Sequence, residues 1–255
     1  MFWLKIGFSI GVGLLLYGNI SLANSAVKTK LTIAQAEENS QTNKRPAPPQ
    51  RIPPNRVKPG GGLDANRQSC TQNGKSLTAL IPVKNPVLTS QAYPSFLFYI
   101  PDPAGAISHA ELAIFTADEK SRIYSTKIVL PKNTTPGIIK ITVPASLQYA
   151  LQTNTYYHWY FRVYCENSFN ELSSLNIDGW IERVATVNSK LQLESTSNDI
   201  WYDAIAEAAD DVMITPESLT VRDRWLQMLQ HINLEHLVNS PIFDIEQQLE
   251  GQESN

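Results

Sequence analysis

The sequence predicts a mainly β protein with a C-terminal α part: a seven-stranded antiparallel β-sandwich with a short helical segment packed on it. Three observations predict this class. Between residues 76 and 184, short runs rich in β-branched and aromatic residues are separated by Pro, Gly and Asn turn signals. No long helical pattern interrupts these runs, so the strands are expected to be antiparallel. After residue 198, apolar residues recur with the helical period.

Residues 1–23 have the pattern of a cleaved secretory signal peptide. Lys5 precedes an apolar run from Ile6 to Tyr17, and Ser21-Leu22-Ala23 supplies the small residues that a signal peptidase requires. The run is short for a bilayer span; a retained membrane anchor is the alternative. No Cys lies near the cleavage point, which excludes a lipoprotein anchor. We therefore expect a periplasmic or secreted protein of the cell envelope, with no membrane span after cleavage.

Net charge divides the rest of the chain into three segments. Residues 24–67 carry a net charge of +5, residues 68–198 of +1 and residues 199–255 of −10. Residues 24–69 also contain six prolines, which predicts a disordered, basic, Pro-rich tether. Residues 198–248 form the expected acidic helical segment, and residues 249–255 a disordered tail. Nucleic acid is not expected as a partner, because the basic residues lie in a mobile part of an exported chain.

The two cysteines, Cys70 and Cys165, are an even pair in an oxidising compartment, which predicts a disulfide. Such a bond closes a loop of 95 residues. In the chain-entropy model a loop of that length stabilises a fold by about 4–5 kcal/mol. A metal pair or a reactive thiol is the weaker alternative, because neither cysteine has a Cys or His at ligand spacing.

The β-sandwich is assigned to residues 70–190. Its seven expected strands span residues 77–82, 95–100, 110–116, 122–130, 137–143, 156–165 and 179–184. Alternation supports them; Phe96, Phe98 and Ile100, for example, share one face. The strand at 156–165 carries the strongest fold signal, and it is preceded by Leu151-Gln152-Thr153-Asn154-Thr155.

This segment resembles the start of the penultimate strand in fibronectin type III domains. By that resemblance Tyr157 is the corner tyrosine, whose hydroxyl bonds to backbone a few residues upstream. Four residues on the same face as Tyr157 are expected in the core: Trp159, Phe161, Val163 and Cys165. The immunoglobulin pattern of two Cys on facing strands is absent, because Cys70 precedes the first strand.

The opposite face of the same strand is too aromatic to be left in water. It carries Tyr156, His158, Tyr160, Arg162 and Tyr164. Two amphipathic helices follow, and we predict that they cover this face. Asn198 is the expected cap of the first helix, and Thr215 with Pro216 the expected start of the second.

An independent helical lobe and a sugar-stacking aromatic platform are the alternatives to that covered face. The candidate interaction residues are Tyr160, Arg162, Tyr164, Trp201 and Trp225.

No residue set predicts a catalytic centre, a cofactor site or a metal site. The four His residues lack the spacing of zinc ligands, and no Gly-x-Ser-x-Gly motif marks a hydrolase serine. Two carboxylate pairs, Asp178 with Glu182 and Asp203 with Glu207, are typical of ion-paired or solvated residues. The alternative is a hydrolase of envelope polymers that uses one of these pairs.

Five segments together suggest a family. They are LTALIP at 77–82, PSFLFYIP at 94–101, YHWYF at 157–161, GWIER at 179–183 and IWYDA at 200–204. The combination resembles an exported cyanobacterial family known as domain of unknown function 928, over residues 59–242. The resemblance implies that the sandwich and the helices form one unit. It implies no activity, cofactor or catalytic residue.

We therefore expect an exported, non-catalytic binding or interaction module of the cell envelope, without a cofactor. Its partner would be an envelope protein or a glycan. Besides the hydrolase, the remaining alternative is a structural or assembly factor that acts through its acidic helices. The oligomeric state is not predicted.

Overall fold

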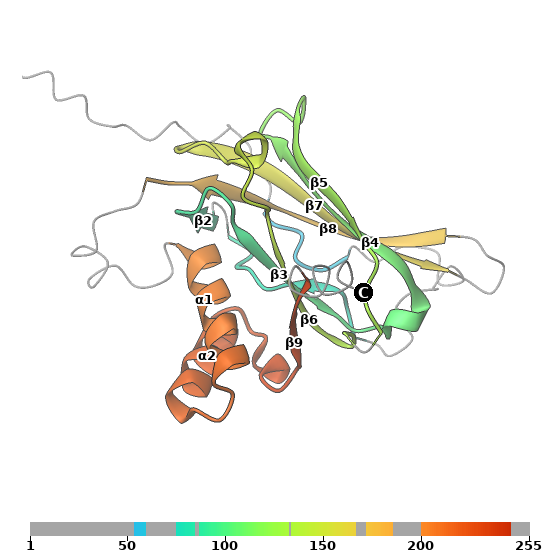
Figure 1. Cartoon of the computed structure of the whole chain (residues 1–255), viewed down its shortest axis with the longest axis vertical. Helices are drawn as coiled ribbons and strands as arrows, with labels where there is room; N and C mark the ends of the chain where they lie inside the picture. Colours follow the sequence, from blue (N-terminus) through green and yellow to red (C-terminus); the bar gives the residue numbers. More distant parts are fainter. Residues whose placement is uncertain are drawn as a thin grey trace, which may run out of the picture. The chain divides into compact units, whose positions relative to one another are not determined.

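The computed structural model describes residues 54–59, 75–84, 87–132, 134–166, 172–185 and 200–245. Within these ranges the chain forms two mixed β-sheets, of four and five strands, and two α-helices (Figure 1). The prediction of a mainly β protein with a C-terminal helical part is confirmed. The predicted signal peptide, Cys70 and the tail at 249–255 lie outside the described residues.

The four-stranded sheet has the order β1-β3-β6-β9. Its strands are β1 (Thr78–Ala79), β3 (Ser95–Ile100), β6 (Gly137–Thr142) and β9 (Ile242–Asp244). β3 pairs antiparallel with β1 and β6, whereas β9 pairs parallel with β6.

The five-stranded sheet has the order β2-β8-β7-β4-β5. Its strands are β2 (Val87–Thr89), β8 (Leu172–Arg183), β7 (Thr155–Glu166), β4 (Ile107–Thr116) and β5 (Arg122–Ile128). The long strands pair antiparallel, and β2 runs parallel to β8.

Each of the seven predicted strands overlaps an observed one. The predicted sandwich lacked two strands, β2 and β9, and the expectation of purely antiparallel sheets was wrong. Both strands have three residues, too few to show a period of two. Each is joined to a parallel partner that is distant in sequence, so local patterns carry no information about the pairing.

The two sheets meet in an aromatic core between them. Phe98 of β3 stacks on Phe161 of β7 with ring centroids 3.9 Å apart, and Trp159 lies edge-on to Phe98 at 5.6 Å. As predicted, Tyr157, Trp159, Phe161, Val163 and Cys165 are all buried. Alternation along β7 thus correctly identified the face that packs inward.

The predicted tyrosine corner is present. The backbone N–H of Gln152 donates to the hydroxyl of Tyr157 at 2.8 Å. The two partners are five positions apart in the sequence, so the bond fixes the turn that leads into β7.

Part of the expected tether belongs to the folded unit. Asn55 is only 4% exposed; its side chain donates to the carbonyl of Pro82 and accepts from the backbone N–H of Trp180. Arg56 forms an antiparallel bridge with Asp178 of β8. The prediction of disorder was therefore wrong for residues 54–59. The backbone of this segment bonds to β1 and β8, the Asn55 amide adds two more bonds, and Val57 packs against the core, which together order it.

The C-terminal part forms α1 (Trp201–Ile214) and α2 (Leu219–His231). α1 packs against β2, β3 and α2 (Figure 1). Its first turn enters the open edge of the sandwich. There the indole N–H of Trp201 donates to the carbonyl of Leu80, and that of Trp159 donates to the hydroxyl of Tyr202.

Two carboxylates of α1 fasten the helix to the sheets. Asp203 accepts hydrogen bonds from the hydroxyl of Thr89 and the backbone N–H of Ser90, at the end of β2. Asp210 lies 2.6 Å from the ammonium of Lys140 on β6. Burial alone would lower the pKa of Lys140, but Asp210 and Asp244 of β9 outweigh it and raise that pKa.

The predicted location of the helices was wrong. α1 packs against β2 and β3 at the open edge of the sandwich, and α2 packs on α1, so the helices do not cover the aromatic face of β7 (Figure 1). Their predicted starts also differ: α1 begins after Ile200, and the capping residue of α2 is Ser218, whose hydroxyl accepts from the N–H of Val221. Asn198 lies outside the described residues. The described residues also contain three short 3-10 helices: Ala104–Ala106, Leu147–Tyr149 and Glu235–Leu237.

Cys165 is completely buried, and no free cysteine occurs in the described part of the chain. Its expected partner Cys70 is not described, so the Cys70–Cys165 disulfide stays a prediction.

Candidate binding face

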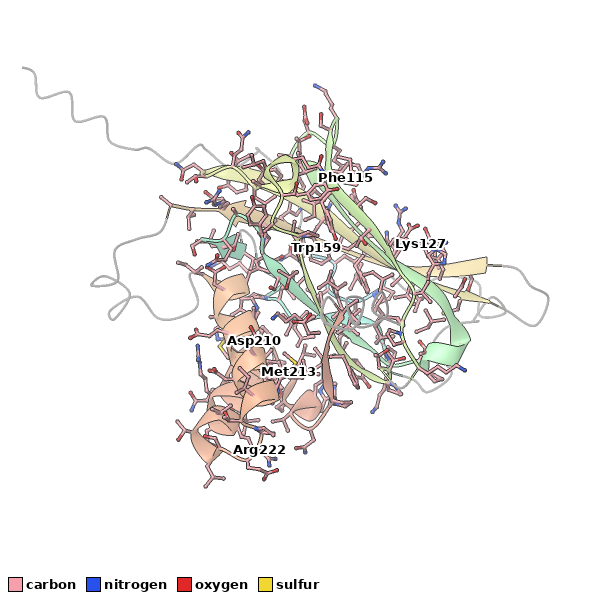
Figure 2. The ribbon with its side chains drawn as sticks, in the orientation of Figure 1. Phe115, Lys127, Trp159, Asp210, Met213 and Arg222 are labelled. Carbon is pink, nitrogen blue, oxygen red and sulfur yellow. The ribbon has the colours of Figure 1, made fainter. Side chains whose placement is uncertain are left out.

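The five-stranded sheet has a face that points away from the four-stranded sheet, here called the outer face. On β7 it carries Tyr156, His158, Tyr160, Arg162 and Tyr164. Their neighbours on adjacent strands are His109, Glu111 and Phe115 of β4, Lys127 of β5, and Asp178 and Trp180 of β8. Figure 2 shows Phe115 and Lys127 on this sheet, with Trp159 between them and the helix residues Asp210 and Met213.

His158 forms the centre of one polar cluster on the outer face. Its Nδ1 lies 2.6 Å from Glu119 Oε1, and its Nε2 lies 3.1 Å from Asp178 Oδ2. Carboxylate oxygens only accept hydrogen bonds, so the imidazole supplies the donor in each of these contacts. The ring also stacks on Trp180 at 4.3 Å, and Arg56 approaches the other oxygen of Asp178 at 3.4 Å. The cluster thus brings together Glu119, His158, Asp178 and Arg56 from four segments of the chain.

Glu119 reaches this cluster from the turn between β4 and β5. Its backbone has φ of 57°, the left-handed region that residues other than Gly seldom adopt. Its carboxylate accepts from His158 and from the hydroxyl of Tyr160. The hydrogen bond from His158 is the main reason that the pKa of Glu119 falls below its usual value. The turn is therefore held against the outer face by charge-assisted bonds.

Tyr160 is the aromatic residue that this cluster holds in place at the surface of the outer face. It is partly exposed, and its hydroxyl donates to Glu119 Oε1 at 3.0 Å. Phe115 meets its ring edge-on at 5.9 Å, and the guanidinium of Arg162 lies 5.8 Å from the ring centroid. Burial, followed by the bond to Glu119, raises the pKa of Tyr160 to about 12. The ring is thus fixed in position while part of it stays accessible.

A second cluster surrounds Tyr164, further along β7. Its hydroxyl donates to Glu111 Oε2 at 3.1 Å, and its ring stacks on His109 at 4.3 Å. His109 Nε2 lies 3.7 Å from the other oxygen of Glu111. Tyr160 and Tyr164 are therefore each held by a carboxylate and a neighbouring ring.

Two cations on the outer face remain available. Arg162 and Lys127 are exposed, and neither forms an ion pair with another residue in the described ranges. Each is a neighbour of Glu111 in the strand register. Positive and negative groups are thus interleaved with the aromatic rings, and no charge of one sign dominates.

The structure divides the predicted interaction residues into two groups. Tyr160, Arg162 and Tyr164 lie together on the outer face. Trp201 and Trp225 are each 1% exposed and belong to the core, so their assignment to an interaction surface was wrong. Trp residues that recur at the helical period mark the apolar face of a helix. The spacing does not show whether that face contacts a partner or the rest of its own chain.

The prediction missed Glu119, Phe115 and Lys127. The turn at 117–119 was recognisable in the sequence, but its return onto His158 depends on the β4–β7 register. Strand alternation would have placed Glu111 and Phe115 on one face of β4.

The suggested catalytic carboxylates occupy structural positions. Asp178 and Glu182 lie four residues apart on one face of β8, which corresponds to about 13 Å along a strand. Glycosidase pairs lie about 5–9.5 Å apart. Asp203 is bonded to the end of β2, and Glu207 lies 2.8 Å from Arg224. The described part of the chain also holds no group of three or more His, Cys, Asp or Glu side chains placed to bind a metal ion.

A pocket of about 490 Å³ lies on the helical side of the molecule. It is lined by Val212, Met213, Pro216, Ser240, Pro241, Ile242, Phe243 and Asp244. Most of this lining is apolar, and the Asp244 carboxylate already binds Lys140. The pocket therefore presents no convergent set of polar groups that would select a ligand.

Comparisons with known proteins identify a family but no activity. A family model described as Domain of Unknown Function (DUF928) matches residues 61–242. No curated protein matches the chain. One solved structure, "pT26-6p", is 17% identical with a TM-score of 0.25; the match covers 61% of this chain and 30% of that one. Similarity this low supports no inference.

None of the described helices has the length and apolarity needed to cross a membrane.

Proposed function

The chain belongs to the DUF928 family, and from this premise we propose that it is an exported, non-catalytic binding module of the cell envelope that holds its ligand on the outer face. One observation carries the proposal. Two partly exposed tyrosines, Tyr160 and Tyr164, are each fixed by a carboxylate and a neighbouring ring on a rigid sheet.

Preorganised aromatic side chains favour binding for an energetic reason. A mobile side chain loses about 0.5–1.5 kcal/mol of rotamer entropy when a ligand immobilises it. Tyr160 and Tyr164 have lost most of that freedom already, because their rings and hydroxyls are both engaged. Arg162 lies between them on β7 with an exposed guanidinium.

The non-catalytic part of the proposal is supported by the roles of the carboxylates. Asp203 and Glu207 fasten helices, and Asp178 bridges His158 and Arg56. Of the two suggested pairs, Asp178 and Glu182 lie too far apart, and Asp203 and Glu207 are both already bonded, so neither pair has the spacing and freedom that acid–base catalysis by two carboxylates requires.

Export is supported by residues 1–23, whose composition fits a signal peptide.

We also infer that the sandwich is of the fibronectin type III or immunoglobulin-like kind. Support comes from the strand orders β1-β3-β6 and β8-β7-β4-β5 and from the tyrosine corner at Tyr157. In this interpretation β2 and β9 are additions at the sheet edges.

The proposed function is tested by affinity capture from envelope extract with the purified protein. The Y160A variant should lose most of the captured material, because the substitution removes the accessible ring. R222A is the control, since Arg222 is an exposed arginine on α2 (Figure 2). Equal capture by the wild type and Y160A, or no capture at all, would contradict the proposal.

A further inference from the structure

Resting on the proposed function, we propose that the ligand of the outer face is a glycan that stacks on Tyr160 and Phe115 and bonds through its hydroxyls to Arg162, Lys127 and Glu111. This assigns a chemical class to the ligand. The assignment follows from the aromatic rings, hydrogen-bond donors and acceptors, and charges of the outer face taken together.

Stacking is the first requirement. A pyranose presents a face of C–H groups that packs against an aromatic ring, and such contacts exclude water from apolar surface. Tyr160 and Phe115 provide two adjoining rings that are both partly exposed. The bond from Tyr160 to Glu119 keeps its ring from rotating away.

Recognition of hydroxyl groups is the second requirement. A sugar hydroxyl both donates and accepts, so a glycan site needs donors and acceptors within reach of the same ring. Arg162 and Lys127 supply donors without competing ion pairs among the described residues. Glu111, whose side chain is 36% exposed, supplies acceptor oxygens between them.

The distribution of charge favours a glycan over a protein. The centre of a protein interface is depleted of Lys, Glu and Asp, although Arg and aromatic residues are enriched there. Here a carboxylate adjoins each of the two tyrosine rings: Glu119 at Tyr160 and Glu111 at Tyr164. A protein partner would have to bury these charges, whereas a hydrated sugar can bond to them.

The length of the face sets the size of the ligand. Tyr160 and Tyr164 lie four residues apart on one strand, a separation of about 13 Å. Arg162 lies midway between them. A short oligosaccharide segment is therefore long enough to span both tyrosines, and the rest of a longer polymer would extend beyond β7.

The test measures binding of the purified protein to three probes: soluble peptidoglycan fragments, a neutral glucan and a polyuronate. We expect the wild type to bind at least one of them in affinity electrophoresis and calorimetry. Y160A and F115A should each weaken that binding by about tenfold or more, as removal of a central contact does. Y160F keeps the ring and should stay within about threefold of the wild type. R222A should bind like the wild type.

The charge of the ligand is resolved by R162A. If the protein binds the polyuronate, R162A should lower its affinity for the polyuronate much more than its affinity for the neutral glucan. Added salt should likewise lower the affinity for the polyuronate more than that for the glucan. Thermal unfolding of each variant shows that the fold is retained. Because Tyr160 and Phe115 are partly exposed, both alanine variants should unfold close to the wild type.

Two results would overturn the inference. One is failure of the wild type to bind any of the three probes while capture from envelope extract still depends on Tyr160. The glycan inference is then overturned, and the proposed function survives. The other is glycan binding that is unchanged in Y160A and F115A, which would place the sugar elsewhere on the molecule. Loss of Tyr160-dependent capture altogether would reject the proposed function as well.

Discussion

Gly179 of β8 gives a sharp test of how the core is packed. It lies opposite Trp159 in the β7–β8 register. A Cβ at this position would lie 2.4 Å from Cζ2 and 2.8 Å from Cε2 of Trp159, and 3.0 Å from Oδ1 of Asn55. The Trp159 ring is itself held by its bond to Tyr202 at 2.7 Å. G179A therefore forces a completely buried indole to move.

The size of the effect follows from these distances. An ordinary contact begins at 3.4 Å, so the ring must retreat by about 1.0 Å from its 2.4 Å position. Overpacking of this kind costs about 1–3 kcal/mol. Weakening of the bond to Tyr202 adds about 0.5–1.5 kcal/mol. Alanine also lowers the conformational entropy of the unfolded chain relative to glycine, which stabilises the folded state by about 0.4–1 kcal/mol. We expect G179A to lower the free energy of unfolding by about 2 kcal/mol.

Urea unfolding followed by tryptophan fluorescence measures this change. G105A is the matched control, because a Cβ at Gly105 meets nothing within 4 Å. That variant should be unchanged or more stable by up to about 1 kcal/mol. If G179A proves as stable as G105A, the packing described for Trp159, Gly179 and Tyr202 is incorrect.

Three further predictions concern other parts of the fold. Y157F removes the acceptor of the corner hydrogen bond and should cost about 0.5–1.5 kcal/mol in urea unfolding; an unchanged midpoint would deny the corner a stabilising role. D203A removes the carboxylate that ties α1 to β2 and should cost about 1.5–3 kcal/mol, whereas E207A, at an exposed ion pair, should cost under about 1 kcal/mol. The reverse order would refute the assigned roles. Finally, the pKa of Tyr160 is raised from 10.0 to about 12, so the neutral phenol is favoured in the folded state. Its contribution to stability is complete below pH 10 and is lost as the pH rises through about 12. Y160F should abolish the loss of stability at high pH that is due to Tyr160. The difference in phenolate absorbance between the wild type and Y160F should report the titration of Tyr160. A titration midpoint near 10 would contradict the burial of Tyr160 and its bond to Glu119.

Local patterns predicted the long strands well because a period of two is visible over five or more residues. Tyr157, Trp159 and Phe161 alternate inward on β7 as expected, and the corner bond of Tyr157 was predictable from its position before the strand. Three-residue strands offer no such period. β2 and β9 exist because β8 and β6 provide an edge for them.

Half of the candidate site could be predicted in the same way. Tyr160, Arg162 and Tyr164 follow from alternation on a single strand. Glu119 and Lys127 join them only through the β4–β7 and β4–β5 registers, which depend on pairing between distant segments.

The sequence by itself determined which side chains of each long strand point inward, that two amphipathic helices follow the strands, and that the chain belongs with its family. Only the tertiary structure decided that Trp201 and Tyr202 enter the open edge beside β2 and β3. The physical reason is that an amphipathic stripe requires burial of a face but does not specify its partner. Two aromatic surfaces were available, and hydrogen bonds from Trp159, Thr89 and Lys140 selected one of them.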